Sequence, residues 1–306
     1  MRAVTIADQA AGVEGLELSE IGFPHAAEND VVVEVHAAGF TPGELTWPAT
    51  WTDRAGRDRT PSVPGHEVAG IVTELGYGTT GLTVGQRVFG LTDWARNGSL
   101  AEYVSVEARN LAPLPATVDF TIAAALPISG LTAWQGLFEH GRLQVGQTVL
   151  IHGAAGGVGS IAIQLARSSG ARVIGTGRAA DRQTALDLGA DEFFDLENDR
   201  LEDAGSVDLV LDVIGGDIYA RSLALVRPGG RIVTIAAPPP AQPENGEALF
   251  FVVEPDRVIL AELVKRVSAG DLVPIVGAVR PLEEVVSAFA PAMRVHGKTI
   301  ISVRGD

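Results

Sequence analysis

The chain has 306 residues, 46% of them hydrophobic and 20% charged, which is enough for two domains of ordinary size with buried cores. Its formal net charge is −15 and it has no dense run of Lys or Arg, which argues against binding to duplex nucleic acid or to an anionic membrane. It contains no cysteine, which excludes disulfides, thiolate nucleophiles and thiolate metal sites.

The first residues indicate a strand rather than a targeting signal. Met1 leads directly into the alternating segment 2–6, which lacks the charged and then apolar regions of a signal peptide. No apolar run is long enough to span a bilayer. We therefore expect a cytoplasmic protein.

The first third of the chain is typical of a small β-domain. Short apolar and β-branched runs, separated by turns rich in Gly and Pro, predict strands at 31–35, 68–75, 86–91 and 100–106. A long loop, residues 41–64, carries Trp47 and Trp51 among prolines and charges. We expect a β-barrel-like domain over residues 1–120.

From residue 121 the pattern changes to alternating strands and helices. Strands are predicted at 148–152, 172–176, 207–213, 231–236 and 249–253, and helices at 158–168, 181–188, 218–226 and 257–267. This alternation predicts a doubly wound parallel sheet over residues 121–267, and so an α/β fold class. The tail, 268–306, ends in the strand-like run 298–303 and is expected to complete the first domain.

A glycine-rich turn follows the first predicted strand of the second domain. The pattern is Ala154-x-Gly156-x-x-Gly159, and it runs directly into a helix. Glycine lets the backbone approach a pyrophosphate, and a helix N-terminus offers free N–H groups to its charge. Such turns also serve packing alone, but this position in a strand–helix–strand unit favours dinucleotide binding. The expected contacts are Ala155, Gly156, Gly157 and Val158.

The end of the second strand indicates which dinucleotide binds. NAD sites usually place an acid there for the ribose 2′-hydroxyl, but this chain has Gly177 and Arg178, with no carboxylate before Asp181. An arginine can bind a 2′-phosphate bidentately, and Arg182 lies one helical turn further on. The alternative is that Arg178 is a solvated loop cation. We favour NADPH as the cofactor.

These motifs, with others, resemble the zinc-independent quinone oxidoreductase branch of the medium-chain dehydrogenase/reductase superfamily. The matching segments run almost from end to end: 37–39, 64–70, 84–88, 125–127, 130–134, the glycine turn, 188–191 and 297–298. The resemblance implies a GroES-like barrel completed by the carboxy-terminal tail, a Rossmann nucleotide-binding domain, and an active site in the cleft between them. It also implies a homodimer.

The resemblance implies further cofactor contacts. Thr132 matches the threonine beside the nicotinamide, and two apolar pairs match positions that line its pocket. These pairs are Ile235 with Ala236 and Phe251 with Val252. Apolar residues of this kind are expected in a core in any case, so we expect them to act through their backbone.

The pair His66-Glu67 raises the question of a metal, because zinc-dependent members of the superfamily use this histidine as a ligand. Catalytic zinc needs three protein ligands, and the position that is cysteine in those relatives is Thr41 here. A lone His beside a Glu is more often a hydrogen-bonded structural pair. We predict no metal site.

Without a Lewis acid, an activated acceptor is expected, such as a small quinone or an α,β-unsaturated carbonyl compound. Hydride addition to either moves negative charge onto oxygen, and Thr41 is a candidate hydrogen-bond donor to that oxygen. Its departure from the asparagine common in quinone reductases leaves the substrate class open. Aromatic side chains that are candidates for the substrate site, or alternatively for the barrel core, are Trp47, Trp51, Phe89 and Trp94.

Two other functions remain open. The chain is also compatible with an enoyl-thioester reductase, whose carrier arm would use the loop arginines Arg54, Arg57 and Arg59. The other hypothesis is a non-catalytic sensor that binds NADPH, because the fold alone does not prove that a protein is an active enzyme. Alcohol dehydrogenase activity is the weakest reading, since the zinc ligands are missing.

Overall fold

The computed structural model describes residues 1–290 and 295–304. The chain folds as two compact units. The first comprises Met1–Ile128, Pro255–Asp271 and Val276–Asp306, and the second comprises Ser129–Glu254 and Leu272–Ile275. The helix predicted at 257–267, which we assigned to the nucleotide-binding domain, is α7 (Arg257–Ala269) and lies in the first unit.

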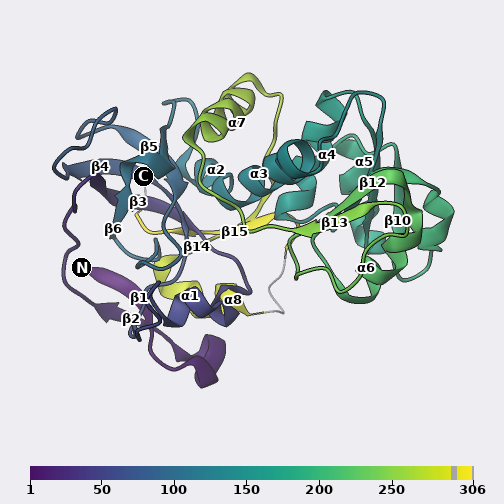
Figure 1. Cartoon of the computed structure of the whole chain (residues 1–306). Helices are drawn as coiled ribbons and strands as arrows, with labels where there is room; N and C mark the ends of the chain where they lie inside the picture. Colours follow the sequence, from purple (N-terminus) through teal and green to yellow (C-terminus); the bar gives the residue numbers. More distant parts are fainter. Residues whose placement is uncertain (291–294, 305–306) are drawn as a thin grey trace. The chain divides into compact units, whose positions relative to one another are not determined.

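The first unit is built on a seven-stranded sheet (Figure 1). In spatial order its main path is β14 (Val276–Pro281), β15 (Lys298–Ser302), β3 (Asp30–Gly39), β4 (Glu67–Leu75), β5 (Arg87–Leu91) and β7 (Leu111–Pro113), with β6 (Tyr103–Glu107) also pairing with β3. A separate hairpin joins β1 (Arg2–Ile6) to β2 (Leu16–Glu20). Because β15 pairs antiparallel with β3, the tail returns to the first unit as expected.

The core of this unit follows from the alternation of its strands. Val31, Val33 and Val35 point to one buried side of β3, since alternate residues of a strand share a face. Phe40 and Phe289 stack with ring centroids 4.0 Å apart, which ties the end of β3 to the tail. Short helices complete the unit: α1 (Pro48–Trp51), α2 (Phe120–Ala124) and α8 (Val285–Phe289).

The second unit contains the predicted parallel sheet. Its six strands run in the order β10 (Glu192–Asp195), β9 (Arg172–Gly177), β8 (Thr148–His152), β11 (Val207–Asp212), β12 (Val226–Thr234) and β13 (Glu247–Phe250), and every neighbouring pair is parallel. Numbered along the chain, this is the order 3-2-1-4-5-6 of a doubly wound dinucleotide-binding sheet. The prediction of the sheet is confirmed, although β10 was not predicted.

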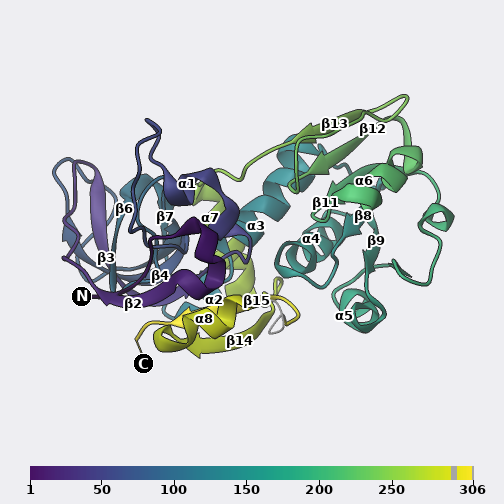
Figure 2. The same cartoon turned by 90° about the horizontal axis from the view of Figure 1, so that it is seen from below.

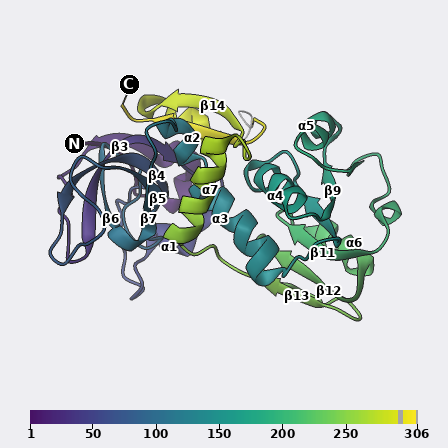
Figure 3. The ribbon, with the colours of Figure 1, turned by 90° about the horizontal axis from the view of Figure 1, so that it is seen from above.

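Helices cover both faces of this sheet. Figures 2 and 3 show α4 (Gly157–Ser168) and α5 (Arg182–Asp187) on one face and α6 (Gly216–Ser222) on the other. The helix α3 (Pro127–Trp134) precedes the first strand. The segment 228–230 lies inside β12, where a positive φ of 80° at Gly229 accompanies a register shift against β11. In the described residues, none of the helices has the length and apolar character needed to cross a membrane.

Candidate functional site

The glycine turn of the second unit is shaped by backbone packing. Gly153 has a φ of 68°, and a Cβ at Gly159 would lie 2.2 Å from the carbonyl oxygen of Gly153. The first turn of α4 therefore rests directly on the end of β8, which only glycine permits. Gly156 is the N-cap of α4, no side chain caps this end, and its first turn carries no acid. Backbone N–H groups at this helix end can bind an anion.

A buried polar network fixes the carboxyl edge of the sheet beside this turn. His152 Nδ1 lies 2.8 Å from Thr176 Oγ1, and its Nε2 lies 2.8 Å from Ser222 Oγ. Burial lowers the pKa of His152 to about 4, so the ring is neutral at pH 7. The ring therefore links the ends of β8 and β9 to α6. No sequence motif indicated this network, because its members are separated by 24 and 70 residues.

The end of β9 presents Arg178 to solvent, but an acid is close by. Asp181 Oδ2 accepts a hydrogen bond of 2.8 Å from the backbone N–H of Arg178, and a Cβ at Gly177 would meet the same oxygen. The guanidinium of Arg182 is engaged elsewhere: it donates to Phe193 O and Asp199 Oδ2, both at 2.8 Å. These bonds occupy part of the Arg182 guanidinium, and its assisting role at a 2′-phosphate stays a prediction.

The residues expected near the nicotinamide have different environments. Thr132 is 2% exposed on α3, and the Phe251 ring packs 4.5 Å from the ring of His140. Ile235 is half-buried and bonds through its N–H to Asp212 O, while Ala236 and Val252 are exposed. Their contacts with a cofactor stay predictions.

In the first unit, Trp47, His66 and Trp94 form an aromatic cluster. The Trp47 and Trp94 rings meet edge to face with centroids 5.3 Å apart, and His66 lies 4.9 Å from Trp94. His66 Nδ1 lies 2.9 Å from Thr92 Oγ1. Burial, aided by the positive charge of Arg59, lowers the pKa of His66 to about 3, so this ring is neutral. Both tryptophans are half-buried, as a wall for a planar ligand requires.

Two other aromatic residues lie outside the cluster of Trp47, His66 and Trp94. Phe89 is 0% exposed on β5, between strands β4 and β7. Trp51 is 8% exposed in the core of the unit, and its Nε1 donates to Leu45 O at 2.9 Å. Both side chains are used in packing, as in the alternative assignment to the barrel core, and their role in the substrate site stays a prediction.

Beneath Thr41 lies a buried carboxyl that sequence reasoning missed. Glu44 is 0% exposed; its Oε2 accepts from Thr41 N at 3.2 Å and its Oε1 accepts from Gly65 N at 2.7 Å. Burial raises the pKa of Glu44 to about 8, opposed by its two backbone bonds and by Lys298. The carboxyl therefore joins the Thr41 turn to the segment before β4. A glutamate two residues beyond a Pro-Gly turn gave no signal of burial.

His66 and Glu67 have separate partners. The Glu67 carboxylate accepts from Ile128 N at 2.9 Å and pairs with the Lys298 ammonium, which comes from β15. Adjacent residues of an extended strand face opposite sides, so the expected His66–Glu67 hydrogen-bonded pair is wrong.

The side chains around His66 do not fit a zinc site. Its Nδ1 is taken by Thr92, Thr41 is a poor ligand for zinc, and the Glu67 carboxylate is already paired with Lys298. Within the described residues there is no group of three His, Cys, Asp or Glu residues that could hold a metal ion. We derive no step through a metal.

Comparisons with known proteins agree with this architecture. Residues 27–116 match the family model described as the alcohol dehydrogenase GroES-like domain, and residues 157–270 match the model described as zinc-binding dehydrogenase. The chain is 30% identical over 319 residues to a quinone oxidoreductase of Rattus norvegicus, covering 97% of this chain and 95% of the relative. It is 31% identical to a 2-methylene-furan-3-one reductase of Solanum lycopersicum, covering 98% of this chain and 79% of that protein.

Solved structures place the whole chain in the same family. The quinone oxidoreductase of Coxiella burnetii superimposes with a TM-score of 0.91 at 27% identity and covers 99% of each chain. The mycobacterial protein Rv1454c, solved in complex with NADPH, gives a TM-score of 0.85 at 26% identity, with 99% of this chain and 100% of that chain covered. The chain belongs to the quinone oxidoreductase branch of the medium-chain dehydrogenase/reductase superfamily, and it is an oxidoreductase with a GroES-like unit and a Rossmann unit.

Proposed function

We propose that this oxidoreductase uses NADPH to reduce a quinone or an α,β-unsaturated carbonyl compound. The observation that carries the proposal is the turn from Gly153 to Gly159, where an uncapped helix N-terminus meets a backbone that only glycine can form. Free backbone N–H groups at such a turn are the donors that a pyrophosphate accepts from in dinucleotide-binding domains.

The preference for NADPH rests on Arg178. Its side chain is exposed and forms no ion pair in the described part of the chain, so its guanidinium is available for a 2′-phosphate. The Asp181 carboxylate accepts from the backbone of Arg178. The NADPH complex of the mycobacterial relative supports the same preference.

The choice of acceptor rests on the first unit. Trp47 and Trp94 offer flat, half-buried surfaces of the kind that a planar quinone or enone stacks against. The names of the rat and tomato relatives point to the same two acceptor classes.

The residues of this chain would then divide the work. NADPH, when bound, supplies the hydride. The Thr41 hydroxyl, which has no hydrogen-bond partner among the described residues, donates to the oxygen on which charge develops. The carboxyl of Glu44 holds the Thr41 backbone, and the neutral ring of His66 cannot supply a proton at pH 7. The proton that completes the product comes from solvent.

The test is NADPH oxidation with a small quinone, an enone, an enoyl thioester and a simple ketone. We expect turnover of the quinone or the enone and none of the ketone. In Thr41→Ala, kcat should fall about tenfold, the effect of losing roughly 1.4 kcal/mol from the transition state, while Thr41→Ser keeps most of it.

Other outcomes would redirect the proposal. Turnover of the enoyl thioester alone would favour the biosynthetic reductase. Tight NADPH binding without turnover of any acceptor would favour the sensor. Unchanged kcat in Thr41→Ala would remove Thr41 from the mechanism.

A further inference from the structure

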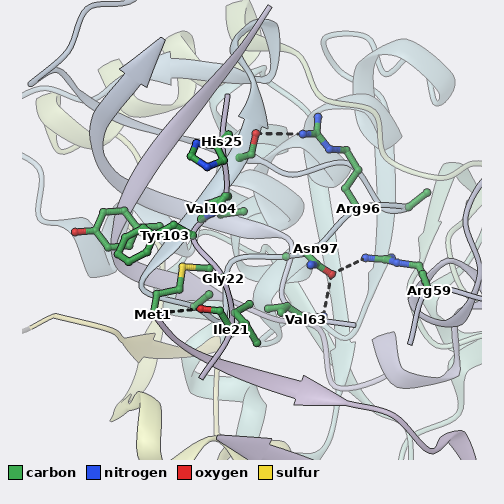
Figure 4. A pocket seen from close by; sticks show the side chains of 16 residues that line it. Met1, Ile21, Gly22, His25, Arg59, Val63, Arg96, Asn97, Tyr103 and Val104 are labelled. Atoms are coloured by element: carbon green, nitrogen blue, oxygen red, sulfur yellow. Dashed lines mark hydrogen bonds between the residues drawn. The ribbon is translucent and has the colours of Figure 1, made fainter. Parts of the chain in front are cut away.

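A cavity of about 540 Å³ lies within the first unit, apart from the aromatic cluster around His66 (Figure 4). Its walls come from the segments 21–25, 95–98 and 103–105, together with Met1, Arg59, Val63 and Ala101. None of its sixteen lining residues is an aspartate or a glutamate, although the chain has 38 acids and a net charge of −15. Two of them are arginines. The charged side chains that line the cavity are therefore both cations, and the buried Asp30 lies behind one of them, Arg96.

The two arginines differ in how their charge is balanced. Arg96 forms a two-pronged ion pair with the buried carboxylate of Asp30, at 3.2 and 2.5 Å, and also donates to Ser105 Oγ. This ion pair raises the pKa of Arg96. Arg59 forms no ion pair with a carboxylate in the part of the chain that the structure describes. Of the two arginines that line the cavity, Arg59 is therefore the one whose charge is not balanced by an ion pair.

The acids nearest to Arg59 are already taken. Asp93 pairs with Arg54, and Asp53 pairs with Arg57. Arg59 instead donates to two carbonyl oxygens, Ala49 O at 2.6 Å and Trp94 O at 3.2 Å, and to the side-chain oxygen of Asn97 at 3.3 Å. Burial lowers the pKa of Arg59, and the nearby charges of Asp93 and Asp53 offset this effect only in part. An anion in the cavity would supply that compensation.

Asn97 provides a second donor. Its Oδ1 accepts from both Arg59 and the backbone N–H of Val63, as Figure 4 shows. These two bonds fix the orientation of the amide, and in the described residues its Nδ2 donates to nothing. A carboxylate can accept from a guanidinium and an amide side by side.

The far end of the cavity is apolar and aromatic. The rings of Phe23 and Tyr103 lie 4.9 Å apart, and Phe23 is 59% exposed. Figure 4 shows Tyr103 on the opposite side of the view from Arg59. Val104, the next residue along the chain from Tyr103, also lines the cavity. A ligand with an anionic head and a flat apolar body would match both ends.

We infer that this cavity binds an aryl carboxylate, with its carboxylate on Arg59 and Asn97 and its ring against Phe23 and Tyr103. The inference does not rest on the proposed reductase activity, because none of these side chains belongs to the nucleotide turn or to the Trp47–His66–Trp94 cluster, although Arg59 donates to Trp94 O beside that cluster.

The test is calorimetric titration of the full chain with benzoate, beside benzamide as the uncharged match and inorganic phosphate as an anion without a ring. Benzoate should bind, and benzamide and phosphate should each bind at least tenfold more weakly. Arg59→Met should raise the Kd for benzoate at least tenfold, and Asn97→Ala and Phe23→Ala about threefold each. Arg142→Met, which removes an exposed cation of the second unit, should leave the Kd unchanged.

Because Arg59 also holds the loop to Trp94 O, its variant must be checked for folding by circular dichroism. Phe23→Ala and Asn97→Ala keep the test decisive if Arg59→Met unfolds, since both side chains are exposed. Equal binding of benzoate and benzamide, or of benzoate and phosphate, would overturn the inference. So would a Kd that responds to Trp47→Ala but not to Phe23→Ala.

Discussion

In the second unit, the residues that we assign to the pyrophosphate of the nucleotide follow one another from Gly153 to Gly159 and act through their backbone. In the first unit, the candidate site is assembled from side chains that lie far apart in the sequence, such as Glu44, Glu67 and Lys298. The former is a matter of close packing between a helix and a strand end. The latter depends on buried charges and the hydrogen bonds that balance them.

This difference has a consequence for how each unit responds to change. A backbone site is insensitive to pH and sensitive to any added atom, because its geometry is fixed by contact. A site held by buried carboxyls depends on their protonation. The two units should therefore fail under different perturbations.

The largest expected effect is on the first unit and comes from Glu44. Its pKa is about 8 in the folded protein, against an ordinary value of 4.5. The folded state binds the proton of Glu44 more tightly than the unfolded state does. The contribution of Glu44 to the free energy of unfolding is therefore highest below pH 4.5, and it falls as the pH rises towards 8. The full decline is about 5 kcal/mol.

Urea unfolding of the wild type and Glu44→Gln between pH 5 and pH 8.5 measures this slope. The variant should lack the decline, whatever its absolute stability. Glu17→Gln, at an exposed carboxyl of β2, should run parallel to the wild type. Parallel curves for Glu44→Gln and the wild type would show that the buried carboxyl is not what the first unit depends on.

A smaller effect is expected from Gly159→Ala in the second unit. The new Cβ would lie 2.2 Å from Gly153 O, so α4 must move away from the end of β8. We expect the Kd for NADPH to rise about a hundredfold, or roughly 2.7 kcal/mol, by fluorescence titration. Gly43→Ala is the control, because its φ is −89° and a Cβ there meets nothing within 4 Å. Unchanged affinity in Gly159→Ala would mean that the turn serves packing alone.

The same difference explains what the sequence predicted. The strand–helix alternation and the glycine spacing are local, so the doubly wound sheet and the turn could be predicted. Strand β10, Glu192–Asp195, was missed because it is only four residues long and half of its side chains are exposed or half-buried. The buried carboxyl of Glu44 accepts a hydrogen bond from the backbone N–H of Gly65, which is 21 residues away. No periodicity in the sequence predicts such a contact.

The aromatic residues show most clearly what could not be predicted from the sequence. Trp47 and Trp51 lie in one loop, and the sequence makes both of them candidates for a substrate site. The structure separates them, because Trp51 donates to Leu45 O inside the core whereas Trp47 stays half-buried beside Trp94. Likewise, Arg178 and Arg182 are one helical turn apart, and only tertiary structure shows that Asp199 neutralises Arg182.

The most direct test of the account is titration of the wild type and Arg178→Ala with NADPH and NADH, followed by fluorescence. We predict that the wild type binds NADPH at least tenfold more tightly than NADH. Arg178→Ala should lose this preference, while its affinity for NADH should be unchanged. Arg172→Ala is the control, because it removes a cation of β9 that is paired with Glu192 of β10. This variant should behave as the wild type. Equal affinity of the wild type for both nucleotides, or a preference that survives in Arg178→Ala, would contradict the cofactor assignment.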